Sequence, residues 1–161
     1  MSAKRLTFEM LDNLIYEAQK SPRQRLHLNL HNNYSENVQR LLNAIGTESY
    51  IRPHRHLFDP KPELLVAVSG VMSLLVFNFD GEIENITRFG CSRGTINCFA
   101  VEVSPATWHT VIAETPDAVI LEIKPGPFNP DAAKEYAPWA PDENSPAARA
   151  YFAGLRDKLA N

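Results

Sequence analysis

Histidine side chains are the residues of this sequence best suited to bind a metal ion. Two of the five histidines, His54 and His56, lie two positions apart in the run Arg-Pro-His-Arg-His that begins at Arg52. Because the side chains of a β-strand alternate between its two faces, a strand here places both imidazole rings on one face, one pleat apart. The spacing therefore predicts that His54 and His56 bind one metal ion together.

A carboxylate and a third imidazole complete the candidate metal site. Glu63 opens the next apolar run, and the Leu-Phe-Asp-Pro-Lys-Pro loop before it can fold it back beside the histidine pair. His109 lies far along the chain and would reach the site from across a barrel. Three neutral imidazoles and one carboxylate suit one divalent transition metal ion, such as Zn, Fe, Mn or Ni. Asp59 and Glu48 are alternatives to Glu63, although neither begins an apolar strand.

Three further polar residues are candidates for substrate binding. In a regular strand, Arg52 and Tyr50 point the same way as His54 and His56, so we expect them to supply a cation and a phenol to a cavity. The alternative is that Arg52 lies only at the rim, because the register of a strand end slips easily. His31 lies in a polar segment before the first expected strand, where it fits either a pocket rim or a solvated surface.

The histidine and glutamate pattern resembles the two motifs of the cupin superfamily. The first motif runs from a glycine through His-Arg-His and a glutamate to a second glycine, and the second, farther along the chain, reads Pro-x-Thr-Trp-His. The resemblance implies a jelly-roll barrel that holds a metal ion inside. The matching residues are Gly46, His54, His56, Glu63, Gly70, Pro105 and His109.

The sequence departs from the usual cupin pattern at three places. Six residues, two of them prolines, separate His56 from Glu63, where cupins usually have fewer. The glycine expected near Thr107 is absent, and alanine replaces the terminal asparagine at position 113. These differences loosen the motif without removing a metal ligand.

Several longer phrases resemble the WbuC family of bacterial cupin-fold metalloproteins and spread over most of the chain. They read V-Q-R-L-L-N-A-I, P-H-R-H, P-x-T-W-H, L-E-I-K-P-G-P-F and A-P-W-A-P. The resemblance implies a small jelly-roll metalloprotein encoded in some bacteria near genes for surface polysaccharide. It implies no established reaction.

Three kinds of function are compatible with such a site. The first is an enzyme that acts on a small oxygenated molecule, such as a sugar or a sugar precursor, either as an isomerase or epimerase or as an Fe(II) dioxygenase. The second is a non-catalytic module that binds or senses a small molecule through the metal. The third, a structural metal site, normally closes tetrahedrally and often uses thiolates, whereas Cys91 and Cys98 lie away from the histidines in sequence.

The elements that must position these residues are mostly strands. Short apolar runs broken by turn residues predict an all-β sandwich or barrel. Asp80-Gly81 predicts a tight hairpin with a type I′ turn. Trp108 is the neighbour of His109 in an expected strand, so its side chain should point to the opposite face, away from the metal, and pack against other parts of the chain. The expected strands are 38–44, 49–56, 63–69, 71–79, 83–89, 98–103, 107–113 and 118–123.

Helices are expected at both ends of the chain. Thr7 caps an amphipathic first helix that stops at Ser21. A tail with six prolines, from 124 to 146, should run extended over the surface and be held by its aromatic residues. The last helix is predicted to start with Ser145 as its cap. We expect one domain over 1–161, with an N-terminal helix and polar arm (1–37), a jelly-roll core (38–124) and a tail with a C-terminal helix (125–161).

The composition excludes several classes of partner. The chain has 161 residues, and its 16 Lys and Arg against 19 Asp and Glu leave no excess positive charge for nucleic acid or an anionic membrane. The N-terminus lacks the unbroken apolar stretch of a signal peptide, and no apolar run is long enough to span a bilayer. We therefore expect a cytoplasmic protein with reduced thiols and a small-molecule ligand.

The third and fourth expected strands are apolar on both faces. If Glu63 points inward, Leu64, Val66 and Val68 point outward, and the run from Val71 shows the same lack of alternation. An exposed patch of this kind would associate, so either the terminal helices or a second subunit must cover it. We expect a homodimer.

Overall fold

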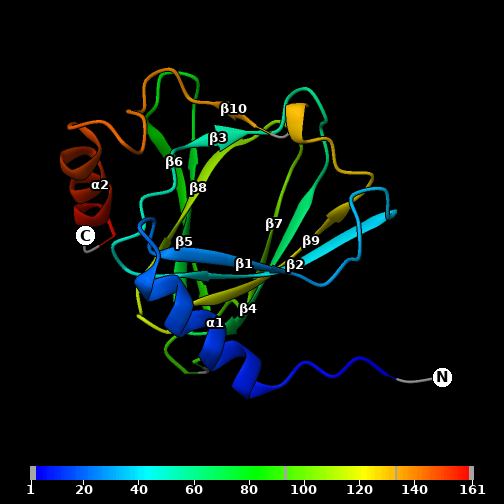
Figure 1. Cartoon of the computed structure of the whole chain (residues 1–161). Helices are drawn as coiled ribbons and strands as arrows, with labels where there is room; N and C mark the ends of the chain where they lie inside the picture. The colour runs from blue at the N-terminus through cyan, green and yellow to red at the C-terminus, as the bar shows by residue number, and fades with distance from the viewer. Residues whose placement is uncertain (1–2, 93, 133, 160–161) are drawn as a thin grey trace.

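Two antiparallel five-stranded sheets pack face to face as a jelly-roll sandwich (Figure 1). The computed structural model describes residues 3–92, 94–132 and 134–159. In the first sheet the strand order is β1-β2-β9-β4-β7, and in the second it is β10-β3-β8-β5-β6. The strands of the first sheet are Arg25–Asn29 (β1), Val38–Ile45 (β2), Val119–Pro125 (β9), Glu63–Ser69 (β4) and Ala100–Val103 (β7); those of the second are Glu135–Tyr136 (β10), His54–Arg55 (β3), Trp108–Ala113 (β8), Val71–Phe77 (β5) and Ile83–Gly90 (β6).

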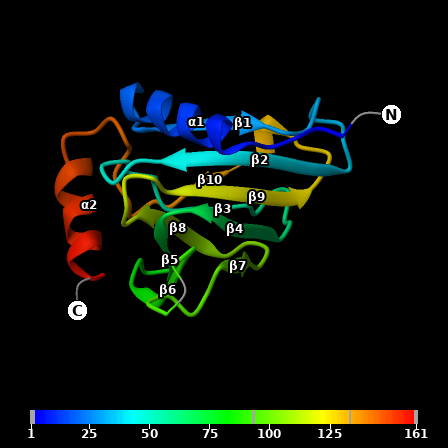
Figure 2. The ribbon, with the colours of Figure 1, turned by 90° about the horizontal axis from the view of Figure 1, so that it is seen from below.

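Helix α1 (Phe8–Lys20) lies on the outer face of the first sheet, along β1 and β2 (Figures 1 and 2). The Thr7 hydroxyl caps it by accepting a hydrogen bond from the Met10 N–H at 3.3 Å, as expected. Its apolar side buries surface against the sheet, which removes that surface from water. The buried residues of this layer are Leu11, Leu14, Ala18, Leu42, Ala44 and Val119.

Helix α2 (Ala148–Asp157) and the tail before it cover the outer face of the second sheet. Trp139 packs against Phe77 and Trp108, with ring centroids 5.0 and 6.2 Å apart. The predicted Ser145 cap is wrong: Ala147 precedes the helix without a side-chain cap, and the Ser145 carbonyl accepts from the Ala148 N–H at 3.1 Å. The short 3-10 turn Pro130–Ala132 lies in the tail between β9 and β10.

The outer faces of β4 and β5, which carry apolar residues where a solvated face would alternate with polar ones, are covered to different degrees. Leu75 and Phe77 of β5 are buried under α2 and the tail. Val68 of β4 packs against the cluster beneath α1, whereas Leu64 and Val66 are only half-buried. The terminal helices therefore account for β5 and for one end of β4.

The expected strand over 49–56 is wrong, since only His54–Arg55 has strand geometry. Pro53 has no N–H to donate to a ladder. The preceding segment is held by other bonds, such as the one from the Thr110 hydroxyl to the Ile51 carbonyl at 2.6 Å. Two strands were not predicted: β1 lies in the expected polar arm, and β10 lies in the tail that was expected to form no sheet.

The turn at Asp80-Gly81 joins β5 and β6 as predicted, but it is not of type I′. That type needs a positive φ at both central residues. Gly81 has a φ of 87°, whereas Asp80 is not among the residues with positive φ. The Gly81 N–H donates to the Asn78 carbonyl and the Asn78 N–H to the Glu82 carbonyl, so the loop is longer than a two-residue turn.

Both cysteines are free thiols, in agreement with the expectation. Cys91 donates to the Ala67 carbonyl and Cys98 to the Ala100 carbonyl. Among the described residues, neither helix is long and apolar enough to cross a lipid bilayer.

Candidate metal centre

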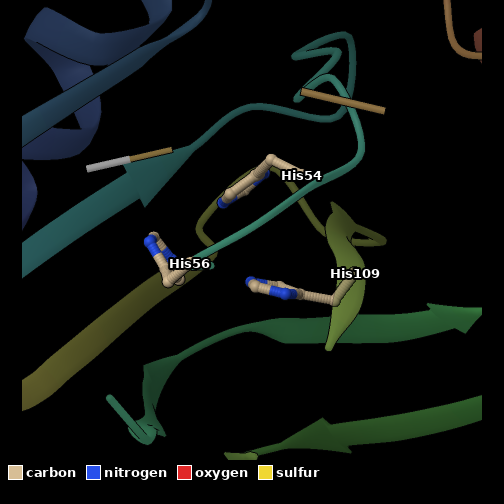
Figure 3. Close-up of side chains that lie close together, drawn as sticks. All are labelled: His54, His56 and His109. Atoms are coloured by element: carbon tan, nitrogen blue, oxygen red, sulfur yellow. The ribbon is translucent and has the colours of Figure 1, made fainter. Parts of the chain in front are cut away.

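Three histidines from two strands and a loop converge inside the sandwich (Figure 3). His54 lies in β3 and pairs directly with His109 in β8, while His56 follows β3 by one residue. Their ring centroids are 4.6 to 5.8 Å apart. One ring nitrogen from each histidine lies within 4.8 Å of the others. Two nitrogen ligands about 2.1 Å from one ion lie at most about 4.2 Å apart, so small movements of the rings suffice to share an ion.

Hydrogen bonds to backbone carbonyls fix which ring nitrogen faces the centre. His54 Nδ1 lies 3.0 Å from the Arg52 carbonyl oxygen, and His109 Nδ1 lies 2.8 Å from that of Thr107. A carbonyl oxygen only accepts hydrogen bonds, so each Nδ1 carries the proton and each Nε2 keeps its lone pair. This is the arrangement that orients imidazole ligands in metal sites.

Glu63, the first residue of β4, brings a carboxylate from the opposite sheet to the histidines. Its Oε2 lies 3.1 Å from His56 Nε2 and 3.5 Å from His109 Nε2. His109 Nδ1 holds the ring proton, so Nε2 of the neutral ring is a hydrogen-bond acceptor. Oε2 of the Glu63 carboxylate is also an acceptor, and the two atoms therefore repel each other. A cation between them, either a proton or a metal ion, turns this repulsive contact into an attractive one.

Lys124 on β9 holds the other oxygen of the Glu63 carboxylate. Its Nζ lies 2.9 Å from Glu63 Oε1 and 2.9 Å from Glu122 Oε1. Burial disfavours the charge on Lys124, but these two carboxylates outweigh it and raise the pKa of Lys124 above its usual range. Burial alone would also raise the pKa of Glu63, yet its contacts with His109, His56 and Lys124 hold that pKa well below its usual range. Glu63 is therefore an anion.

His54 is held in its neutral form. It is 5% exposed, and burial is the main cause that lowers the pKa of His54 well below 6.5. The charge of Lys134 acts in the same direction. A neutral imidazole is the form that binds a metal ion, so His54 needs to lose no proton at neutral pH. The donor set and its protonation fit a divalent transition metal.

The histidine cluster lines a cavity of about 190 Å³ between the two sheets. An engineered cavity of roughly 150 Å³ holds one benzene molecule, so this one takes a molecule the size of a single sugar ring. The wall contributed by the first sheet is unusually polar for a protein interior. Its residues from β1, β2 and β9 include Arg25, His27, Asn29, Gln39, Asn43, Glu122 and Lys124.

The structure separates the three residues expected at the substrate. His31 lines the cavity and is 7% exposed. Tyr50 lies outside it, packs against Tyr151 and Phe152, and donates to the Pro141 carbonyl. Arg52 also lies outside, where it donates to the Ala137 carbonyl and faces Asp142 at 3.7 Å.

Tyr50 and Arg52 do not point the same way as His54, as strand alternation predicted, because the chain is not a strand before His54. Trp108 does point away from the histidines, as predicted, since it is buried in the cluster under α2. Of the alternatives to Glu63, Asp59 pairs with Lys61, and Glu48 pairs with Arg156.

Sequence reasoning missed most polar residues of the cavity, among them Asn43, Glu122, Lys124 and Lys134. The alternation of β9 offered a usable signal: Glu122 and Lys124 share the inner face with Ile120, opposite Leu121 and Ile123. Lys134 lies in the proline-rich tail, where no periodic pattern predicts its direction.

The sequence matches one family model over residues 6–89, which is more than half of the chain. That model describes a domain of unknown function, DUF6016. The chain belongs to this family. The matched region contains His54, His56 and Glu63 but ends before His109. No curated protein matches the sequence.

Solved structures show that the fold is that of the cupins. Protein SO0799 from Shewanella oneidensis aligns with a TM-score of 0.59 at 11% identity, over 92% of this chain and 95% of its own. The cupin-2 domain protein Rru_A2000 from Rhodospirillum rubrum aligns with a TM-score of 0.53 at 12% identity, over 88% and 84%. Oxalate oxidase in complex with the substrate analogue glycolate aligns with a TM-score of 0.54 at 10% identity, over 86% and 68%. At these identities the similarity concerns the fold alone.

Proposed function

We propose that this chain is a WbuC-like cupin metalloprotein that binds one divalent transition metal ion through His54, His56, Glu63 and His109. We propose further that it acts on a small oxygenated molecule, a sugar or sugar precursor of bacterial surface polysaccharide. The observation that carries the metal site is the meeting of Glu63 Oε2 with His56 and His109 Nε2, two of the three imidazoles of the cluster.

The charge of the site supports an oxygen-rich ligand. One carboxylate against a dication leaves about one formal positive charge, which favours an enolate, a diol or a carboxylate. When bound, the ion supplies Lewis-acid polarisation of such oxygens. The four protein ligands would leave coordination positions free on such an ion, and the cavity that they line would give a small molecule access to it. His54 and His109, fixed by the carbonyls of Arg52 and Thr107, orient the donor atoms.

Metal analysis of the purified protein tests the site. We expect one transition metal ion per chain in the wild type and loss of stoichiometric metal in His56→Ala, because one of four ligands is removed. His27→Ala is the matched control, since His27 lines the same cavity but is not part of the three-histidine cluster. Full metal occupancy in the folded His56→Ala variant would overturn the assignment.

Chelation separates the possible roles of the metal. An isomerase or a dioxygenase loses turnover when the metal is removed, and only the dioxygenase also needs Fe(II) and consumes oxygen. A binding or sensing module shows metal-dependent affinity without turnover. For the pathway, deleting the gene in its own bacterium is expected to change the composition of the surface polysaccharide; an unchanged polysaccharide would contradict that part of the proposal.

A further inference from the structure

Most cations that line the cavity are neutralised by carboxylates of the chain. Arg25 Nη2 lies 2.7 and 2.6 Å from the two oxygens of Glu143. Lys124 pairs with Glu63 and Glu122, as described above. Lys134 differs, because within the described part of the chain it forms no hydrogen bond or ion pair. An uncompensated cation in a concave site attracts an anion.

Lys134 lines the same cavity as the histidine cluster and directly precedes the strand that pairs with His54. The next residues form β10, where Tyr136 pairs with His54 and Glu135 pairs with Arg55. The Arg55 side chain also holds Glu135, with Nε 2.6 Å from Oε2, which anchors this part of the tail. The Lys134 side chain is exposed and lines the same cavity as His54 and His27. Burial is the main cause that lowers the pKa of these two histidines, and the charge of Lys134 acts in the same direction on both. The positive charge of Lys134 is therefore felt at His54 on β3 and at His27 on β1, on two sides of the cavity.

Asn43 presents a side-chain amide oxygen without a hydrogen-bond partner, among the described residues, to the same cavity. It is 7% exposed, and its Oδ1 has no hydrogen-bond partner among the described residues. It lies on the inner face of β2, directly across from His27 of β1. A buried polar group without a partner costs free energy, and a ligand hydroxyl would remove that cost.

We propose that the ligand is a small hydroxycarboxylate whose carboxylate pairs with Lys134 and whose hydroxyl groups lie between Asn43 and the histidine cluster. This inference rests on the proposed function, since it names the substrate class of the same cavity. The volume of about 190 Å³ limits the enclosed part to one sugar-sized unit. Lys134 is then a binding residue for a negative charge, and Asn43 is a partner for neutral oxygens.

Titration calorimetry with matched probes tests the proposal. The probes are D-glucuronate against D-glucose and L-tartrate against L-threitol, because each pair shares its carbon framework and differs in charge. We expect at least one of the acids to bind the wild type about tenfold more tightly than its neutral counterpart, the usual strength of a charge-assisted hydrogen bond. Lys134→Met should remove this preference, and Lys134→Arg should keep most of it. Lys158, an exposed lysine at the C-terminal end of α2, does not line the cavity, so Lys158→Met is the matched control and should bind like the wild type.

Metal content is measured in every sample after titration, so that the two proposals fail separately. A wild type without metal contradicts the proposed metal site, while its anion preference still reports on Lys134. Metal-loaded Lys134→Met with wild-type affinity for the acids overturns the inference. Equal affinity of the wild type for acids and neutral probes, or no binding of either acid at millimolar concentration, overturns it as well.

Discussion

Lys124 Nζ lies 2.9 Å from Glu63 Oε1, while the other oxygen of the same carboxylate faces the imidazoles of His56 and His109. The carboxylate is therefore shared between a permanent cation on one side and the candidate metal centre on the other. Both side chains are largely buried, with 14% of Lys124 and 6% of Glu63 exposed. Their interaction thus couples the stability of the barrel to the occupancy of the site.

Replacing Lys124 with Met should destabilise the metal-free protein by about 3 kcal/mol, because it leaves Glu63 and Glu122 buried without their cation. Metal binding gives Glu63 a new cation, so the loss should be smaller in the metal-loaded protein. Urea unfolding with and without metal measures both values. Lys20→Met, which removes the exposed pair with Glu17 and the contact of the ammonium with the Tyr16 ring, is the control and should change stability by less than about 1 kcal/mol. An equal loss in both metal states would contradict the coupling.

The stability of the metal-free protein should fall as the pH drops below about 6.5. The pKa of His54 is lower in the folded state than its ordinary value of 6.5, so the unfolded chain takes up the proton first. The loss continues until the pH passes the folded pKa, with a slope of up to about 1.4 kcal/mol per pH unit. Glu63 adds a second decline below its ordinary value of 4.5, since its folded pKa is also lowered.

Urea unfolding from pH 7.5 to pH 5 checks this pH dependence. His54→Gln removes the titrating ring, so its curve should be flatter than that of the wild type over this range. Identical slopes for the two proteins would show that His54 is not the group responsible.

Metal release should occur between roughly pH 4 and pH 6, because protons compete at three imidazole ligands whose ordinary pKa is about 6.5 and coordination holds them deprotonated below that value. Dialysis at stepped pH followed by metal analysis measures the transition. It should be steep, since several protons bind as one ion leaves. Any catalytic or ligand-binding activity should fall with the same midpoint, and an activity that survives complete chelation would contradict a metal-centred role.

Ala106→Gly should stabilise the protein by about 1 kcal/mol. Ala106 has a φ of 59°, in the left-handed region that costs a residue with a Cβ roughly 1–2 kcal/mol. It precedes Thr107, near which the cupin resemblance predicts a glycine. For a domain of this size the gain corresponds to an increase in Tm of about 2–4 °C. Ala153→Gly in the exposed part of α2 serves as the contrast, because there the same change should lower the Tm.

A homodimer remains a prediction for the outer face of the first sheet. Leu64 and Val66 are half-buried there, and Phe99 just before β7 is 70% exposed. We expect Val66→Lys to shift the protein from dimer to monomer in sedimentation equilibrium, because a charge in an apolar interface is costly. A wild type that is monomeric at all concentrations would refute the expectation.

The sequence predicts best the elements whose residues are apolar and periodic. The bounds of β4, Glu63–Ser69, were predicted to the residue, and α1 was recognised from its spacing and its Thr7 cap. β1 was missed because its inward residues, Arg25, His27 and Asn29, are polar and resemble a solvated arm. The histidine cluster follows from local spacing, whereas the direction of Lys134 depends on how the tail meets β3, which no local pattern encodes.

The pairing of β10 with β3 joins a late, proline-rich stretch of the chain to the strand that carries His54. The candidate metal ligands, the last of which is His109, and the candidate ligand-selecting lysine therefore belong to separate stretches of sequence. Such a division lets the tail change without altering the metal chemistry of the barrel. Relatives with the same histidines and a different tail would then share a metal ion and differ in the molecule they recognise, so the tail is the part of the sequence by which to sort the family.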